Sequence, residues 1–283
     1  MAQRRATAPA SRSARPDAET FRLTRLERSR FGIVYDIDGP RVRLGIVWFV
    51  VAVVACYLGR FALAVVLAAI AALAAAQTAN TLRTKWRRPS LAVAAVIGGV
   101  IPLAAAYGTA LAGLAVVALS ILAVVAAAMR RPRRTDPLVD AGAMVRAGVV
   151  VGLGAGWLLV LHRIDIGAAV TLLLLASAYE VGDYLVGSGA RNVLEGPLSG
   201  ALAAAVVTAA LALVVQPPPF SGGGLWLYAV VAVATFPLGQ VTASAVLPRA
   251  GAPAPALRRL DSYLLSGLAW MVLLRAGVGI ATG

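Results

Sequence analysis

Apolar runs of about 16 to 23 residues recur along the chain, each close to the roughly 20 residues that a helix needs to cross the hydrocarbon core of a bilayer. The polar segments between these runs are short. Only 13% of the residues are charged and 60% are hydrophobic, whereas about a quarter of the residues in a soluble domain are charged. The sequence therefore predicts an all-α, polytopic integral membrane protein.

About nine transmembrane helices are expected, with boundaries known to within a few residues. They cover roughly residues 43–59, 61–78, 90–107, 109–129, 143–161, 166–186, 196–215, 225–247 and 262–281. This divides the chain into three parts. A basic, partly disordered tail with a membrane-surface segment (1–42) precedes a membrane half of four helices (43–141) and a membrane half of five helices that carries the candidate site (142–283).

The basic residues are distributed unevenly about these spans. All but three of the 26 lysines and arginines lie in the tail, in the loops after even-numbered spans or at the start of the fifth span; the exceptions are Arg60, Arg163 and Arg275. Because such residues concentrate in cytoplasmic loops, we expect a multi-pass protein of the cell inner (plasma) membrane with its N-terminus inside and its C-terminus outside. The same argument explains the net charge of +14, so no nucleic-acid partner is expected. His162 is interpreted as an ordinary residue of an outer loop.

Four acidic residues lie at the predicted cytoplasmic ends of spans: Glu180, Asp183, Glu195 and Asp261. Glu180 and Asp183 are three positions apart and therefore share a helix face. An ionised carboxylate inside a membrane costs about 2.5–3.5 kcal/mol on insertion scales unless it faces water, a partner or a metal. These acids are candidate functional residues. The structural alternative is that they pair with Arg146 or Arg191 and tie helices together.

Two of the acids also have ordinary structural explanations. Glu195 precedes a predicted helix, where a negative charge interacts favourably with the helix dipole. Asp261, in the segment LDSYLL, stands where a helix N-cap is expected. In the stretch GDYLVGSGARN, several glycines precede Arg191, and the exposed backbone amides of such a stretch can bind phosphate. Glycine is, however, also common in membrane helices.

Two stretches of the chain resemble phosphatidate cytidylyltransferases (CDP-diacylglycerol synthases). In AYEVGDYLVGSGARNVLEGPLSG, residues 178–200, the family's acid, small residue, Ala-Tyr, glycine and Glu-Gly positions correspond to Glu180, Gly182, Asp183, Tyr184, Gly187, Glu195, Gly196, Ser199 and Gly200. In GQVTASAVLPR and LRRLDSYLL, the C-terminal signature corresponds to Gly239, Gln240, Ser244, Arg249, Arg258, Arg259, Leu260, Asp261 and Ser262. The resemblance covers roughly residues 140–283.

The chain departs from the family pattern at three charged positions. Asn192 stands where the family has a lysine, Gln240 replaces the aspartate of a Gly-Asp pair, and Arg258 replaces the first aspartate of the closing signature. The loop between Gly187 and Glu195 is also shorter than in the family. These departures weaken a two-metal site, because an arginine cannot bridge two phosphate oxygens as a metal ion does.

The resemblance implies that a phosphatidate oxygen attacks the α-phosphorus of CTP and that pyrophosphate leaves. It implies magnesium as the cofactor, held by Asp261, Asp183 and Glu180, with Arg191 and Glu195 as further catalytic residues. The implied substrate-binding residues are Arg259, Arg258, Tyr184, Gly187, Asn192, Gly196, Ser199, Ser244 and Ser262. The expected partners are CTP or another nucleotide, phosphatidate or another anionic lipid and the bilayer, with a homodimer left open.

Two other functions remain open at this point. The first is a non-catalytic relative that binds lipid or acts as a scaffold, which the replaced signature residues favour. The second is a transporter that uses Glu180 and Asp183 as cation or proton sites. Against a transporter, the sequence shows neither an internal repeat nor acids at mid-bilayer depth.

Overall fold

The computed structural model describes residues 33, 41–130, 136–190, 192, 194–220 and 223–280. The expected membrane-surface segment before residue 41 and the candidate residue Arg191 therefore lie outside the described residues, apart from Ile33. The described part holds helices and two isolated bridges but no strand. Its α-helices are α2 (Arg41–Leu58), α3 (Arg60–Thr81), α4 (Leu91–Ala105), α5 (Thr109–Arg130), α6 (Pro137–Ile164), α7 (Ile166–Gly187), α8 (Glu195–Ala210), α9 (Gly224–Val246) and α10 (Tyr263–Arg275).

Among the described residues, six helical segments are long and apolar enough to cross a membrane: α3, α5, α6, α7, α9, and α8 together with the π-helical turn Leu211–Val215 that continues it. The apolar part of α2, Gly45–Leu58, and α4 are shorter, and α10 has 13 residues. The prediction of an all-α protein is confirmed, and its helices suit a multi-pass membrane protein. Every predicted span overlaps one of these helices, while the count of nine crossings stays a prediction.

Two helix boundaries differ from the predicted ones for identifiable reasons. Helix α6 starts earlier than predicted because Asp136 caps it by accepting a hydrogen bond from the Leu138 amide at 2.8 Å, and Pro137 suits the first helical position. Helix α10 ends at Arg275 instead of continuing to residue 281. Gly277 and Gly279 follow with φ of 71° and 69°, a left-handed conformation that glycine adopts without strain.

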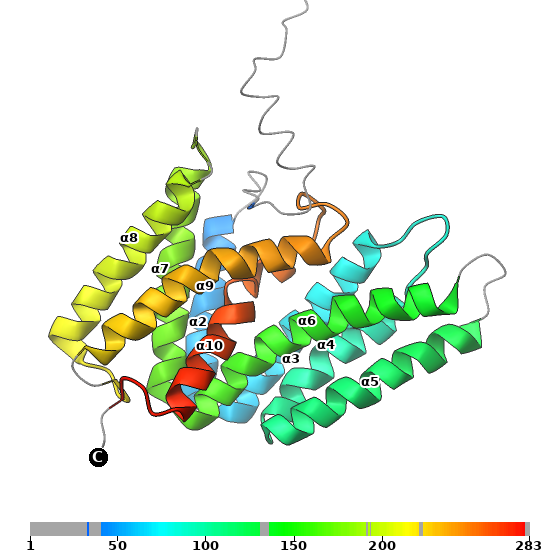
Figure 1. Ribbon diagram of the computed structural model, residues 1–283, viewed down its shortest axis with the longest axis horizontal. Coiled ribbons are helices and arrows are strands. Elements are labelled where there is room, and N and C mark those ends of the chain that lie inside the picture. Colours follow the sequence, from blue (N-terminus) through cyan, green and yellow to red (C-terminus); the bar gives the residue numbers. More distant parts are fainter. Residues whose placement is uncertain are drawn as a thin grey trace, which may run out of the picture.

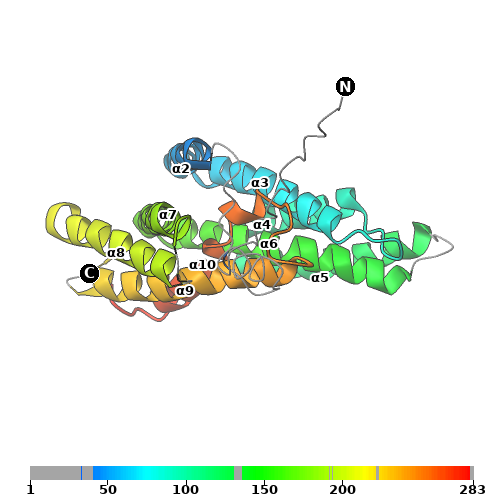
Figure 2. The ribbon, with the colours of Figure 1, turned by 90° about the horizontal axis from the view of Figure 1, so that it is seen from above.

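Helix α6 is the central element of the bundle. Two thirds (67%) of its apolar stretch is buried, compared with 17% in α5 and 17% in α8 with its π-helical turn. It packs against α3, α4, α5, α7, α9 and α10. Figure 1 shows α7 and α8 on one flank and α5 on the other, and Figure 2 shows α2 and α3 along one face with α9 along the opposite face. The exposed sides of α5 and α8 are then the natural lipid-facing surfaces.

Helices α7 and α8 pack closely through glycines, so the face of α7 that carries Gly182 is occupied by α8. A Cβ at Gly182 would lie 2.7 Å from the Ser199 carbonyl oxygen, and one at Gly200 would lie 2.7 Å from the Tyr179 carbonyl oxygen. Such contacts require glycine and are typical of helix pairs in membranes. Ser199 adds a hydrogen bond to the Gly182 carbonyl at 2.9 Å.

Candidate functional site

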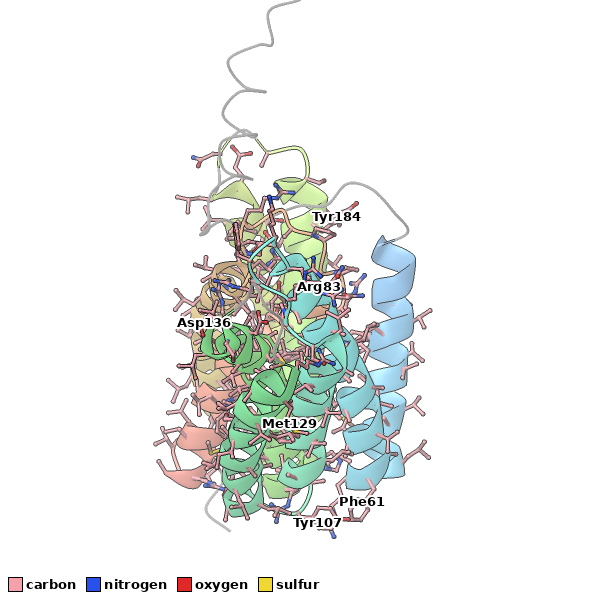
Figure 3. All side chains as sticks on the ribbon, turned by 90° about the vertical axis from the view of Figure 1, so that its right-hand side faces the viewer. Phe61, Arg83, Tyr107, Met129, Asp136 and Tyr184 are labelled. Atoms are coloured by element: carbon pink, nitrogen blue, oxygen red, sulfur yellow. The ribbon has the colours of Figure 1, made fainter. Side chains whose placement is uncertain are left out.

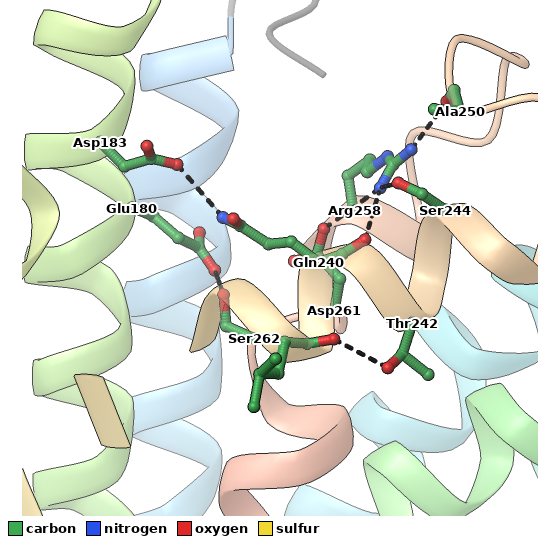
Figure 4. A network of polar contacts seen from close by, with 10 residues as sticks. Glu180, Asp183, Gln240, Thr242, Ser244, Ala250, Arg258, Asp261 and Ser262 are labelled. Atoms are coloured by element: carbon green, nitrogen blue, oxygen red, sulfur yellow. Dashed lines mark hydrogen bonds and ion pairs between the residues drawn. The ribbon is translucent and has the colours of Figure 1, made fainter. Parts of the chain in front are cut away.

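Polar side chains from three separate segments meet beside the C-terminal turns of α7. We call this group the polar cluster; it consists of Glu180, Asp183, Gln240, Ser244, Arg258, Asp261 and Ser262 (Figure 4). Asp183, Gln240 and Asp261 are only 3%, 7% and 4% exposed. Because the burial of polar and charged groups is costly without partners, their mutual contacts decide whether the cluster is stable.

Two hydrogen bonds connect α7 to the C-terminal segments. The Gln240 side-chain amide of α9 donates to Asp183 Oδ2 at 3.2 Å. The Ser262 hydroxyl, just before α10, donates to Glu180 Oε1 at 2.9 Å. Gln240 occupies the place where the resemblance expects an aspartate, so an amide donor faces Asp183 where a second carboxylate would repel it.

Arg258 connects the end of α9 to the turn that precedes α10. Its guanidinium donates to the Ala250 carbonyl at 2.8 Å, the Ser244 hydroxyl at 3.0 Å and the Gln240 carbonyl at 3.5 Å. One guanidinium nitrogen also lies 3.6 Å from Asp261 Oδ2. Arg258 therefore neutralises Asp261 and at the same time holds the 247–256 connection against α9.

Asp261 lies between the short 3₁₀ helix Leu257–Arg259 and α10, outside the membrane-spanning helices. Its interpretation as a helix N-cap is wrong, because the cap residue of α10 is Ser262 and Asp261 faces Arg258 instead. Burial raises the pKa of Asp261 to about 6, although Arg258 and the Ser262 backbone amide favour the ionised form. The backbone here is tightly held: a Cβ at Gly239 would lie 2.2 Å from the Asp261 carbonyl oxygen.

The charges of the cluster act on one another across the segments. Glu180 interacts electrostatically with Asp261, Arg259 and Asp183. The Arg259 guanidinium also reaches α2, where it lies 3.2 Å from the position of a Cβ at Gly45. Three carboxylates and two guanidinium groups therefore share this region, and the guanidinium groups offset part of the repulsion between the carboxylates.

Two buried polar atoms beside the cluster have no hydrogen-bond partner among the described residues. They are the Tyr179 hydroxyl and Gln240 Oε1. The Tyr179 side chain interacts electrostatically with Asp183, Asp261 and Glu180. Since buried polar groups are nearly always hydrogen-bonded, these two atoms mark positions where a ligand or a solvent molecule could bond.

The geometry limits how a metal could bind. Within the described ranges, no group of three or more His, Cys, Asp or Glu side chains is placed to hold a metal ion. Glu180, Asp183 and Asp261 thus do not form a three-carboxylate cage. Magnesium, however, is usually held by one or two carboxylates together with substrate phosphates and water. A magnesium site in the polar cluster would therefore use at most two of its carboxylates, with the remaining ligands supplied by a nucleotide and water.

The other candidate residues of the 178–200 stretch lie at different places. Glu195 and Asn192 are exposed at the start of α8 and in the turn before it, and the Asn192 side chain accepts a hydrogen bond from the Leu194 amide at 3.3 Å. Tyr184 is partly exposed, while Gly187 and Gly196 are buried at helix ends. Ser199 binds the Gly182 carbonyl and so serves helix packing.

Sequence reasoning missed Gln77, which helps to position the cluster, and considered Arg146 only as a partner for the acids. The Gln77 side chain of α3 accepts a hydrogen bond from the Ala256 amide at 2.9 Å, next to the 3₁₀ helix that carries Arg258. Arg146 of α6 donates to the Ala245 and Leu247 carbonyls at the end of α9. The signal for Gln77 was present, since an amide inside an apolar run needs a partner in the protein.

No protein-family model matches the chain, and no curated protein sequence matches it. Over the described residues, the fold and the site define a class: an all-α protein with six helices able to cross a membrane and a buried cluster of acids, arginine and amide beside the C-terminal turns of α7.

Proposed function

We propose that the protein is a CTP-dependent lipid nucleotidyltransferase similar to the phosphatidate cytidylyltransferases. The observation that carries this proposal is the polar cluster itself. Asp183 and Glu180 from one resembling stretch contact Gln240 and Ser262 from the other directly, and Ser262 follows Asp261, which pairs with Arg258. Residues about 80 positions apart in the sequence thus converge, and this convergence supports the proposal.

The reaction is a phosphoryl-type transfer. A phosphatidate oxygen attacks the α-phosphorus of CTP, a new P–O–P linkage forms, and the bond from the α-phosphorus to the bridging oxygen breaks, so that pyrophosphate leaves with the electron pair. Such transfers depend on positioning the phosphates and on neutralising their charge. A bound magnesium ion would neutralise phosphate charge and polarise the phosphorus.

The residues of the cluster have distinct roles in this proposal. Asp183 and Asp261 would hold the magnesium ion that accompanies the nucleotide. Arg259 binds phosphate oxygens, because a guanidinium group can donate two parallel hydrogen bonds to them. Gln240 keeps Asp183 oriented and offers its free carbonyl oxygen to the base or the ribose.

The membrane orientation belongs to the same proposal. With the N-terminus inside, the C-terminal turns of α7 and the 257–262 turn face the cytoplasm, where nucleotides are available. A lipid phosphate in the inner leaflet of the plasma membrane lies at the same depth, so both substrates reach the cluster from the cytoplasmic side.

One observation favours a second candidate, a non-catalytic lipid-binding or scaffold protein. Arg258 already donates to three oxygen acceptors and neutralises Asp261, which leaves it less able to bind a phosphate. Because Arg258 binds the connection between α9 and α10, its role can be structural as well as catalytic.

The test is synthesis of a nucleotide-activated lipid by the purified full-length protein in lipid nanodiscs. The sample receives labelled CTP, phosphatidate and magnesium, and lipid extracts are examined for CDP-diacylglycerol by mass spectrometry. We expect product with the wild type and a loss of at least a hundredfold in the Asp261→Asn and Asp183→Asn variants. Chelation of magnesium should abolish the product.

Asp136→Asn is the matched control, because it removes one carboxylate at the start of α6 while asparagine remains a good helix cap. It should keep wild-type activity. Absence of product with all four nucleoside triphosphates, together with retained binding of phosphatidate, would exclude the transferase and support the lipid-binding alternative.

A further inference from the structure

A second charged site lies at the end of the bundle opposite the polar cluster. The N-terminus of α3 and the last turn of α6 bring Arg60, His162 and Arg163 around an open hollow of about 330 Å³. Ligand sites in proteins begin at about this volume. Helix α7 starts directly after this hollow, and Asp183 lies 17 residues beyond Ile166, or roughly 26 Å at the rise of an α-helix.

The two arginines of the hollow have no acidic partner in the part of the chain that the structure describes. The Arg60 guanidinium lies 4.8 Å from the centroid of the Phe61 ring, and Arg163 lies over the α4–α5 turn, 3.5 Å from the position of a Cβ at Gly108. Asp165, the acid nearest in sequence, accepts the Ala168 amide at 2.9 Å and caps α7. The hollow therefore presents two uncompensated positive charges.

His162 adds a polar group to the same wall. One ring nitrogen, Nε2, lies 2.9 Å from the Cys56 carbonyl oxygen, which fixes it as the donor. The other, Nδ1, is buried without a hydrogen-bond partner among the described residues. The prediction that His162 is an ordinary loop residue is thus wrong, because it belongs to the last turn of α6 and is held in place by α2.

Exposed aromatic side chains surround this end of the bundle. Phe61 and Tyr107, whose ring centroids are 5.6 Å apart, lie at the same end in Figure 3, opposite Tyr184. They are 48% and 64% exposed, and Tyr57 is 70% exposed. Exposed aromatic rings at helix ends are typical of the membrane–water interface, where the phosphate groups of lipids lie.

We infer that the hollow formed by Arg60, His162 and Arg163 binds an anionic phosphate group. The arginines supply paired donors in the geometry that phosphate oxygens prefer, and the His162 ring forms part of the wall beside them. The phosphate can come from the headgroup of an anionic lipid or from a free phosphate. This site is separate from the polar cluster and does not depend on the proposed transferase activity.

The test measures binding of phosphatidylglycerol, phosphatidylcholine and inorganic phosphate to the full chain in detergent, by native mass spectrometry and by the shift in unfolding temperature. We expect phosphatidylglycerol to bind at least tenfold more tightly than phosphatidylcholine, and Arg60→Gln/Arg163→Gln to remove this preference. Arg60→Lys/Arg163→Lys keeps both charges but loses the paired donors, and should show an intermediate loss.

Arg275→Gln is the matched control, because it removes an exposed arginine at the end of α10 that does not line the hollow. It should bind phosphatidylglycerol like the wild type. Competition by inorganic phosphate would identify the phosphate group itself as the ligand, whereas binding of the lipid alone would identify the headgroup with its chains. The inference is overturned if neither probe binds, or if the double glutamine variant binds both probes as the wild type does.

Discussion

The two ends of the bundle handle charge in opposite ways. In the polar cluster, buried acids are matched by Arg258, Gln240 and Ser262 through contacts of 2.9–3.6 Å. In the opposite hollow, Arg60 and Arg163 are exposed and have no acidic partner within the described residues. Buried charges must be compensated inside the protein, whereas exposed charges are free to bind a ligand from outside. Removing charge should therefore reduce stability at the first end and binding at the second.

The largest effect is expected for Arg258→Met. It leaves Asp261 buried without its counter-ion and removes the donor for the Ser244 hydroxyl and the Ala250 carbonyl. Breaking a buried pair in this way typically costs about 3–5 kcal/mol of unfolding free energy. The measurement is unfolding in detergent at pH 7.5, and the companion variant Arg258→Met/Asp261→Leu should recover much of the loss. An unchanged stability in Arg258→Met would show that the pair is not compensating buried charge.

A smaller loss is expected for Gly239→Ala. The new Cβ would lie 2.2 Å from the Asp261 carbonyl oxygen, so the backbone before α10 must shift. Overpacking of this kind costs about 1–3 kcal/mol. Gly142→Ala is the control, since a Cβ at Gly142 meets nothing within 4 Å and alanine favours a helix. Thermal unfolding of both variants separates the effect of the close contact from the effect of replacing a glycine by alanine. Equal unfolding temperatures for the Gly239→Ala and Gly142→Ala variants would contradict the observed contact.

The stability of the folded protein should depend on pH through the titration of Asp261. Its pKa is raised from 3.8 to about 6 in the folded protein, so between these values the folded state binds a proton that the unfolded state has released. The stability from Asp261 is therefore present below pH 4 and is lost as the pH rises to about 6. Asp261→Asn should flatten this part of the profile of unfolding temperature against pH. A profile identical to that of the wild type would argue against a buried, titrating Asp261.

The smallest effect is expected for Arg60→Gln in the absence of lipid. Arg60 is exposed, and its one described contact is with the neighbouring Phe61 ring. Surface substitutions of this kind usually change stability by less than about 0.5 kcal/mol. Unfolding in lipid-free detergent measures this directly. A large loss would mean that the hollow, like the polar cluster, holds the fold together.

Helix positions could be predicted from the sequence because apolar length alone determines them. The predicted spans 166–186 and 225–247 differ by at most one residue at each end from α7, Ile166–Gly187, and α9, Gly224–Val246. The start of α6 could not be predicted in the same way. It depends on Asp136 and Pro137, which lie outside the apolar run and act through a local hydrogen bond.

The candidate site was predictable in part. Glu180 and Asp183 share a helix face by their spacing alone, and the structure places both beside Asp261 and Gln240. Glu195 had the same sequence signature of an acid at a span end, yet it is exposed at the start of α8. The contact of α8 with α7 through Gly182 and Gly200 decides this difference, and no pattern within either helix reveals it.

The sequence by itself determined that this chain is an all-α protein with helices able to cross a membrane, because apolar length and the need to satisfy backbone hydrogen bonds within each helix are local properties. Only the tertiary structure decided which charges meet. Gln240 joins Asp183, Arg146 joins the end of α9, and Arg60 comes beside Arg163 across about a hundred residues. Such pairings depend on how the helices pack and cross, and that geometry follows from contacts between side chains distant in the sequence.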